Sequence, residues 1–103
     1  MMESLRCLLA EIDTAFRLGD YADCLHGLGV IEQNIEALTQ EPDALFRLSR
    51  GLAALRMLHA QHEREGRTAL AADAARRIAE VEQRVAELAR LAEAEMRQRG
   101  GAN

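Results

Sequence analysis

Two histidines one helical turn apart are the residues whose type and spacing best suit chemistry. His59 and His62 precede Glu63, so one helix face would present two imidazoles and a carboxylate. A protein zinc site needs at least three ligands of suitable geometry, and no histidine or cysteine pair elsewhere in the sequence completes the set. Both histidines also continue a row of leucines, where a half-exposed imidazole packs at the edge of a core. We therefore expect no metal and no cofactor.

A third histidine, His26, lies one position away from the apolar face of its helix and is expected to be exposed. Histidine phosphotransfer domains are helical bundles of this size with an exposed histidine followed by x-Leu-Lys-Gly. Here His26 is followed by Gly27, Leu28 and Gly29, so the leucine matches and the lysine does not. Without that lysine a phosphoryl group lacks its charge partner. A degenerate phosphotransfer domain is the more remote alternative, and an ordinary surface histidine is the better interpretation.

The two cysteines are expected to remain unpaired. If the chain turns back near Gly19, Cys7 and Cys24 differ in height along the helices by roughly 10 Å, which exceeds disulfide reach. Two buried or half-buried thiols in a reducing compartment are expected instead. The sequence also contains neither a serine–histidine–acid arrangement nor a glycine-rich phosphate loop after a strand, and we expect a protein that is not an enzyme.

Composition indicates an all-α protein. Apolar residues make up 49% of the 103 positions but aromatic residues only 3%, so leucine and alanine dominate, and there is a single proline. The net charge of −4 argues against nucleic acid as a partner. No window is apolar enough to predict a membrane span, so a cytoplasmic protein is expected. The expected organisation is one domain over 1–99 with a frayed tail over 100–103.

The first half of the chain predicts two amphipathic helices joined by a very short hinge. The first is expected over Glu3–Leu18 and the second over Tyr21–Leu38, with Gly19 ending one helix and Asp20 capping the next. Gly27 and Gly29 weaken the second helix unless a neighbouring helix crosses closely. The apolar faces comprise Leu5, Leu8, Leu9, Ile12 and Phe16 in the first helix, and Tyr21, Cys24, Leu25, Leu28, Ile31, Ile35 and Leu38 in the second.

The second half predicts a third and a fourth helix, because one heptad row stops and another begins. Pro42 suits the first turn of the third helix, and Gly66 with Thr68 as N-cap marks a second hairpin. A single helix from Pro42 to Arg99 is the alternative. The rows are Leu45, Leu48, Leu52, Leu55, His59 and His62, then Ala71, Ala74, Ile78, Val81, Val85, Leu88 and Ala92. Three ion pairs are expected within the fourth helix, each with the acid four residues before its base: Glu80–Arg84, Glu93–Arg97 and Glu95–Arg99. The fold is thus predicted as an antiparallel up-down bundle of four helices.

The segment "FRLGDYADCLHGLGVIEQNIEAL", Phe16 to Leu38, resembles the FliT-like flagellar export chaperones. These small cytoplasmic helical proteins have a Gly-acidic-Trp/Tyr turn between their first two helices. The resemblance covers roughly the first 40 residues, and Gln33-Asn34 stands where the family usually has a basic pair. It implies binding of export substrates such as the filament-cap protein, or of an export-apparatus component. Tetratricopeptide repeats use a similar hinge, but no second copy of the pattern occurs.

A partner's amphipathic helix is predicted to bind an apolar groove shared by the second and third helices. The predicted partner-binding residues are Leu28, Ile31, Ile35, Leu45, Leu48, Leu52 and Leu55. The fourth helix is predicted to gate this groove through Ile78, Val81, Val85 and Leu88, because its alanines contribute less burial than leucines. The alternative is a self-associating structural module, a homodimer that uses a second apolar row on the third helix: Phe46, Ala53, Met57 and Leu58.

Overall fold

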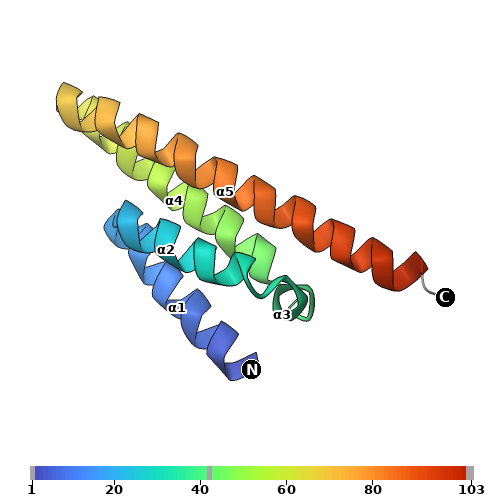
Figure 1. Cartoon of the computed structure of the whole chain (residues 1–103). Coiled ribbons are helices and arrows are strands. Elements are labelled where there is room, and N and C mark those ends of the chain that lie inside the picture. The colour runs from blue at the N-terminus through green and yellow to red at the C-terminus, as the bar shows by residue number, and fades with distance from the viewer. Residues whose placement is uncertain (1, 42, 102–103) are drawn as a thin grey trace.

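The computed structural model describes residues 2–41 and 43–101, and it describes side chains between residues 5 and 100. These residues form helices and no strand, so the all-α prediction is confirmed. The helices are α1 (Met2–Leu18), α2 (Tyr21–Glu32), α3 (Ile35–Thr39), α4 (Ala44–Arg64) and α5 (Thr68–Gly101). Two hairpins, α1–α2 and α4–α5, lie against each other, and the short α3 crosses one end (Figure 1).

The hinge between α1 and α2 forms as the sequence predicts. Gly19 has φ +70°, a left-handed conformation that ends α1 at low cost only for glycine. The Asp20 side chain accepts a hydrogen bond from the Asp23 backbone N–H at 3.2 Å, which satisfies one free donor at the start of α2. One residue therefore ends a helix and the next begins another, and the chain reverses within two positions.

The predicted second helix is wrong in its length, because it breaks at Gln33-Asn34. The Asn34 side-chain amide donates to the Val30 carbonyl at 3.3 Å, while the Asn34 backbone N–H donates to Ile31 at 2.8 Å. A short polar side chain that bonds locally competes with continued helix in this way. The chain then forms α3, which packs against α5 and brings Leu38 into the core. The described residues thus contain five helices instead of four.

The second hairpin is present, and the alternative of one continuous helix is wrong. Gly66 has φ +73° between α4 and α5. Thr68 is the first residue of α5, and its hydroxyl donates to the Gly66 carbonyl at 3.4 Å instead of capping the helix. At the other end α5 continues through the glycine pair to Gly101, and a Cβ added to Gly100 would meet no atom within 4 Å. Pro42, expected in the first turn of the third helix, lies outside the described residues.

The core runs along the interior of the two hairpins. Every member of the predicted α5 row is buried, and so are Leu5, Leu9, Ile12 and Phe16 of the predicted first row. α1 contacts α2 and α4, whereas α5 contacts α2, α3 and α4. The long α4–α5 hairpin gives the molecule its elongated form of 55 × 24 × 18 Å. Its turn projects past the α1–α2 hairpin, as Figure 1 shows.

Candidate partner-binding surface

The predicted partner-binding residues lie together, but inside the closed bundle. Five of them are buried (Leu28, Ile31, Leu48, Leu52 and Leu55) and two are half-buried (Ile35 and Leu45). The predicted gating residues on α5 are buried against them: Ile78, Val81, Val85 and Leu88. In this conformation α5 therefore fills the space in which a partner helix is predicted to bind. Access to these residues requires that part of α5 move.

The buried face of α5 is uneven along its length. Ala71 and Ala74 occupy its first turns and Ala92 one of its last, whereas the four branched side chains lie between them. Burial stabilises a helix in proportion to apolar area, at about 25 cal/mol per Å². The N-terminal turns of α5 are therefore attached by much less apolar burial than its middle.

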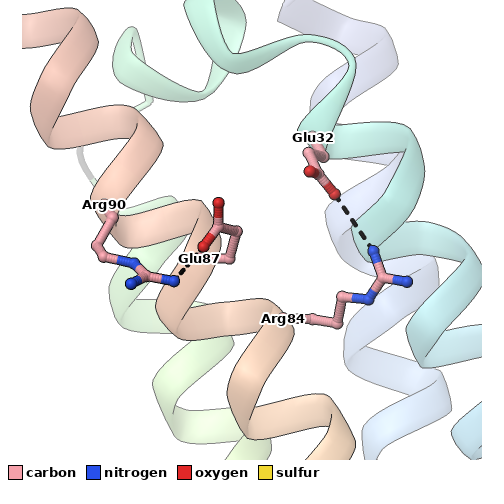
Figure 2. A network of polar contacts seen from close by, with 4 residues as sticks. All are labelled: Glu32, Arg84, Glu87 and Arg90. Atoms are coloured by element: carbon pink, nitrogen blue, oxygen red, sulfur yellow. Dashed lines mark hydrogen bonds and ion pairs between the residues drawn. The ribbon is translucent and has the colours of Figure 1, made fainter.

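Ion pairs join α5 to three neighbouring helices. Arg84 contacts Glu32 of α2 at 3.4 Å, and Glu87 pairs with Arg90 within α5 (Figure 2). Two further pairs join α5 to α4 and to α3: Arg56–Glu82 at 3.0 Å and Arg99–Glu36 at 3.4 Å. Each is substantially exposed and contributes at most about 1 kcal/mol. All of these ion pairs lie C-terminal to Ile78 in α5. Nearer its start, the Arg77 guanidinium lies 5.8 Å from the centroid of the Tyr21 ring of α2, and the ion pairs of Asp73 with Arg76 and Arg77 stay within α5.

The predicted ion pairs within α5 are confirmed in part. Glu93–Arg97 at 4.0 Å and Glu95–Arg99 at 3.7 Å form as expected. The predicted Glu80–Arg84 pair is replaced by Arg84–Glu32, because the end of α2 brings a carboxylate from another helix into reach. Sequence spacing alone does not reveal that tertiary partner.

Large apolar side chains are exposed near the turn of the α4–α5 hairpin. We call residues 57–74 the hairpin tip. Met57 is 73% exposed and Leu70 is 52% exposed, whereas Leu58 is half-buried and lies against Gly19. Leu18, at the neighbouring end of α1, is 75% exposed. Leu18 and Leu70 are not part of the predicted partner surface. In the sequence, Leu18 and Leu70 can be recognised as large apolar residues that lie outside the periodic rows and close to the two turns.

The second apolar row predicted on the third helix lies on the outer side of α4. Phe46 is 62% exposed, Met57 and Ala53 are exposed, and Leu58 is half-buried. Within the described part of the chain, the three exposed side chains have no helix packed over them, whereas Leu58 lies against Gly19 at the α1–α2 hinge. Phe46, Ala53 and Met57 are therefore available to a partner without any rearrangement of the bundle.

The histidines lie at the surface or at its edge. His59 is half-buried and its Nδ1 lies 3.5 Å from the Glu63 carboxylate, while His62 lies 3.2 Å from Arg67. Between residues 5 and 100, Pro42 excepted, no three metal-ligating side chains are grouped so as to hold an ion. His26 is exposed, as predicted, and shares a shallow pocket with Glu11 and Asp23. The two carboxylates beside His26 would repel a negatively charged phosphoryl group on its ring.

The cysteines are both free, as predicted, but they differ in environment. Cys24 is buried, and this burial, with Asp20 and Asp23 nearby, raises the pKa of its thiol to about 11. Cys7 is exposed, so the prediction of a buried or half-buried thiol is wrong there. At 3.6 residues per turn, Cys7 lies on the face of α1 opposite the buried row of Leu5, Leu9, Ile12 and Phe16, which accounts for its exposure.

Within the described residues, no helix combines the length and the apolar character needed to cross a membrane. Comparisons with protein-family models, with curated proteins and with solved structures give no match to this chain.

Proposed function

We propose that this chain is a non-enzymatic helical binding protein whose partner is an amphipathic helix of another protein. The observation that carries the proposal is that the first turns of α5 are attached to the bundle mainly through alanines, and that the same turns carry the exposed Leu70. A partner helix with leucine or phenylalanine at its contact positions would bury more apolar area against α4 than Ala71 and Ala74 do. The partner helix is therefore expected to displace these turns.

The extent of this displacement is limited by energetics. Release of all of α5 would expose Ile78, Val81, Val85 and Leu88, at about 1.5 to 3 kcal/mol for each side chain. That sum approaches the whole stability of a domain, about 5 to 15 kcal/mol. Release of the turns that carry Ala71 and Ala74 costs far less. The hairpin tip is thus the entry site, and the gating prediction is refined to the N-terminal end of α5.

The resemblance of Phe16–Leu38 to the FliT-like chaperones suggests the class of partner. We propose a cytoplasmic chaperone or adaptor of the flagellar type III export system, with an export substrate or an export-apparatus component as its partner. The probe for this proposal is a fluorescently labelled peptide that covers the C-terminal amphipathic helix of the filament-cap protein from the same genome. Absence of binding at peptide concentrations up to about 1 mM would contradict this partner assignment.

Two glycine substitutions test the displacement of α5. Ala72 and Ala75 are exposed, so Ala72→Gly and Ala75→Gly weaken the first turns of α5 by about 1 kcal/mol each without changing the buried face. If binding requires opening, each substitution should raise peptide affinity about fivefold, because the competent state becomes more populated. Ala10→Gly, at an exposed position of α1, is the matched control and should leave the affinity unchanged. Unchanged affinity in the folded α5 variants would refute opening of α5.

A homodimer is the second candidate function, and the exposed row on α4 favours it. Phe46 and Met57 offer apolar surface that a second copy would cover. Sedimentation at micromolar concentration distinguishes the candidates. A dimer that Phe46→Ser dissociates would support the structural module, whereas a monomer supports a surface kept for another protein.

A further inference from the structure

A shallow pocket between α1 and α4 concentrates arginines in a protein that is negatively charged as a whole. It is lined by Asp13, Phe16, Arg17, Arg47, Arg50, Gly51 and Ala54, and we call it the arginine pocket. Its lining holds three guanidinium groups and one carboxylate, whereas the chain has a net charge of −4. The close approach of the two helices forms its floor, because the Phe16 ring lies directly against the Cα of Gly51.

The charges in the arginine pocket are only partly compensated. Arg47 donates to the Asp13 carboxylate at 2.5 Å, and both side chains are largely buried. Within the described residues, no carboxylate lies within 4.0 Å of Arg17, Arg50 or Arg64, whereas the other ten arginines each have such a partner. Two of the three unpaired arginines therefore line one pocket.

An aromatic side chain holds one of these arginines in place. The guanidinium of Arg50 lies over the Phe46 ring, 5.6 Å from its centroid, a cation–π arrangement. Stacking on a ring leaves the N–H groups of a guanidinium, which lie in its own plane, available to donate two parallel hydrogen bonds to a carboxylate. The exposed Phe46 ring beside it supplies an apolar surface that the same ligand would cover.

We propose that the arginine pocket binds a glutamate or aspartate side chain of a protein partner, whose neighbouring apolar residues cover Phe46. Charge complementarity selects a carboxylate, because Arg17 and Arg50 provide two positive charges that no carboxylate of the described residues compensates. A nucleic-acid backbone fits less well, since Asp13 lies in the pocket and the protein is acidic as a whole. This surface is separate from the hairpin tip and remains accessible whether or not α5 opens.

The test uses the full chain and two designed helical peptides of about 16 residues with a fluorescent label. Both carry a leucine row, and they differ only in glutamate or glutamine beside that row. At low salt the wild-type protein should bind the glutamate peptide about fivefold more tightly or better, as expected for charge-assisted hydrogen bonds. This preference should shrink at about 0.5 M NaCl, where charges are screened over a few ångströms.

Variants locate the binding. Arg17→Ala and Arg50→Ala should each remove the preference for glutamate. Phe46→Ser should weaken the binding of both peptides and also reduce the preference, because it removes the ring on which Arg50 stacks. Arg64→Ala, at the far end of α4, is the matched control and should retain the preference. Melting curves establish that each variant is folded, and Arg50→Gln replaces Arg50→Ala if the latter is unstable.

Three results would overturn the proposal. They are equal binding of the two peptides, no binding of either up to about 1 mM, and a preference for glutamate that survives in Arg17→Ala and Arg50→Ala. A homodimer that Phe46→Ser dissociates would also overturn it, because the face would then be occupied by a second copy. Ala72→Gly has no predicted effect here, so failure of this proposal and failure of helix displacement at α5 are distinguishable.

Discussion

Gly27 of α2 lies so close to Ile12 of α1 that a Cβ atom added to it would stand 2.5 Å from Ile12 Cγ1. The glycine thus allows the first hairpin to pack tightly around a residue that is itself buried. Gly29, two positions later in the same helix, has no such neighbour within 4 Å. The sequence shows two glycines that weaken a helix, and the structure shows that only one of them is needed for packing.

Alanine at these two positions should therefore have opposite effects. Gly27→Ala should destabilise the protein by about 1 to 3 kcal/mol, because the β-branched Ile12 has little freedom to move away. Gly29→Ala should stabilise it by up to about 1 kcal/mol through helix propensity. Thermal or urea unfolding of the two variants measures both effects, and equal changes of the same sign would contradict the close crossing of α1 and α2.

The Asp20 cap should have a measurable effect on the hinge. Asp20→Ala should lower the free energy of unfolding by about 1 kcal/mol, because the Asp23 N–H loses its acceptor. Asp20→Asn retains an acceptor oxygen and should stay within about 0.5 kcal/mol of the wild type. Denaturant unfolding at neutral pH is the measurement. A full loss in the asparagine variant would show that charge, not capping, stabilises the start of α2.

The two thiols should differ strongly in reactivity. Cys7 is exposed and should react with maleimide within minutes at pH 8, whereas Cys24 is buried with a thiol pKa of about 11. At pH 8 roughly one Cys24 in a thousand would be a thiolate. Mass spectrometry of timed samples should show one modification in the native protein and two after unfolding. Two equally rapid modifications of the native protein would contradict the burial of Cys24.

The same thiol predicts a loss of stability at alkaline pH. Between about pH 9 and pH 11 the unfolded chain releases the Cys24 proton while the folded chain retains it, so the folded state binds more protons. Stability should therefore fall by about 1 to 2 kcal/mol as the pH rises through this window. The Tyr21 hydroxyl, whose pKa burial also raises, adds to the loss at the upper end. Cys24→Ala should show a smaller decline in urea midpoint, and an identical decline would refute this assignment.

Periodic spacing predicts the secondary structure and the core well wherever packing acts on one helix face at a time. All seven members of the row from Ala71 to Ala92 are buried. The hinge at Gly19 is likewise predictable, because positive φ and side-chain capping are local properties. The spacing does not predict the break at Asn34, because the apolar row continues across it to Ile35 and Leu38. The row reports which residues face the core, whereas the local bond from Asn34 to Val30 decides whether the helix continues.

The candidate surfaces were less predictable, since they depend on which groups lack a partner after folding. The sequence places Arg17 and Arg50 on different helices, and nothing in their spacing shows that they meet at one pocket. Arg84, by contrast, does have a carboxylate partner, but that partner is Glu32 of another helix, which sequence spacing does not indicate either. A sequence pattern identifies the charges, but only the packing of α1 on α4 and of α5 on α2 identifies which of them remain uncompensated.

The central claim is that a partner helix displaces the first turns of α5. Amide hydrogen exchange, measured with and without the filament-cap peptide, tests it most directly. At a saturating peptide concentration, amides between Leu70 and Ile78 should lose protection, while those of α1 between Leu9 and Phe16 should retain it. Loss of protection confined to the start of α5 is the result that helix displacement predicts. Peptide binding with unchanged or greater protection between Leu70 and Ile78 would contradict it.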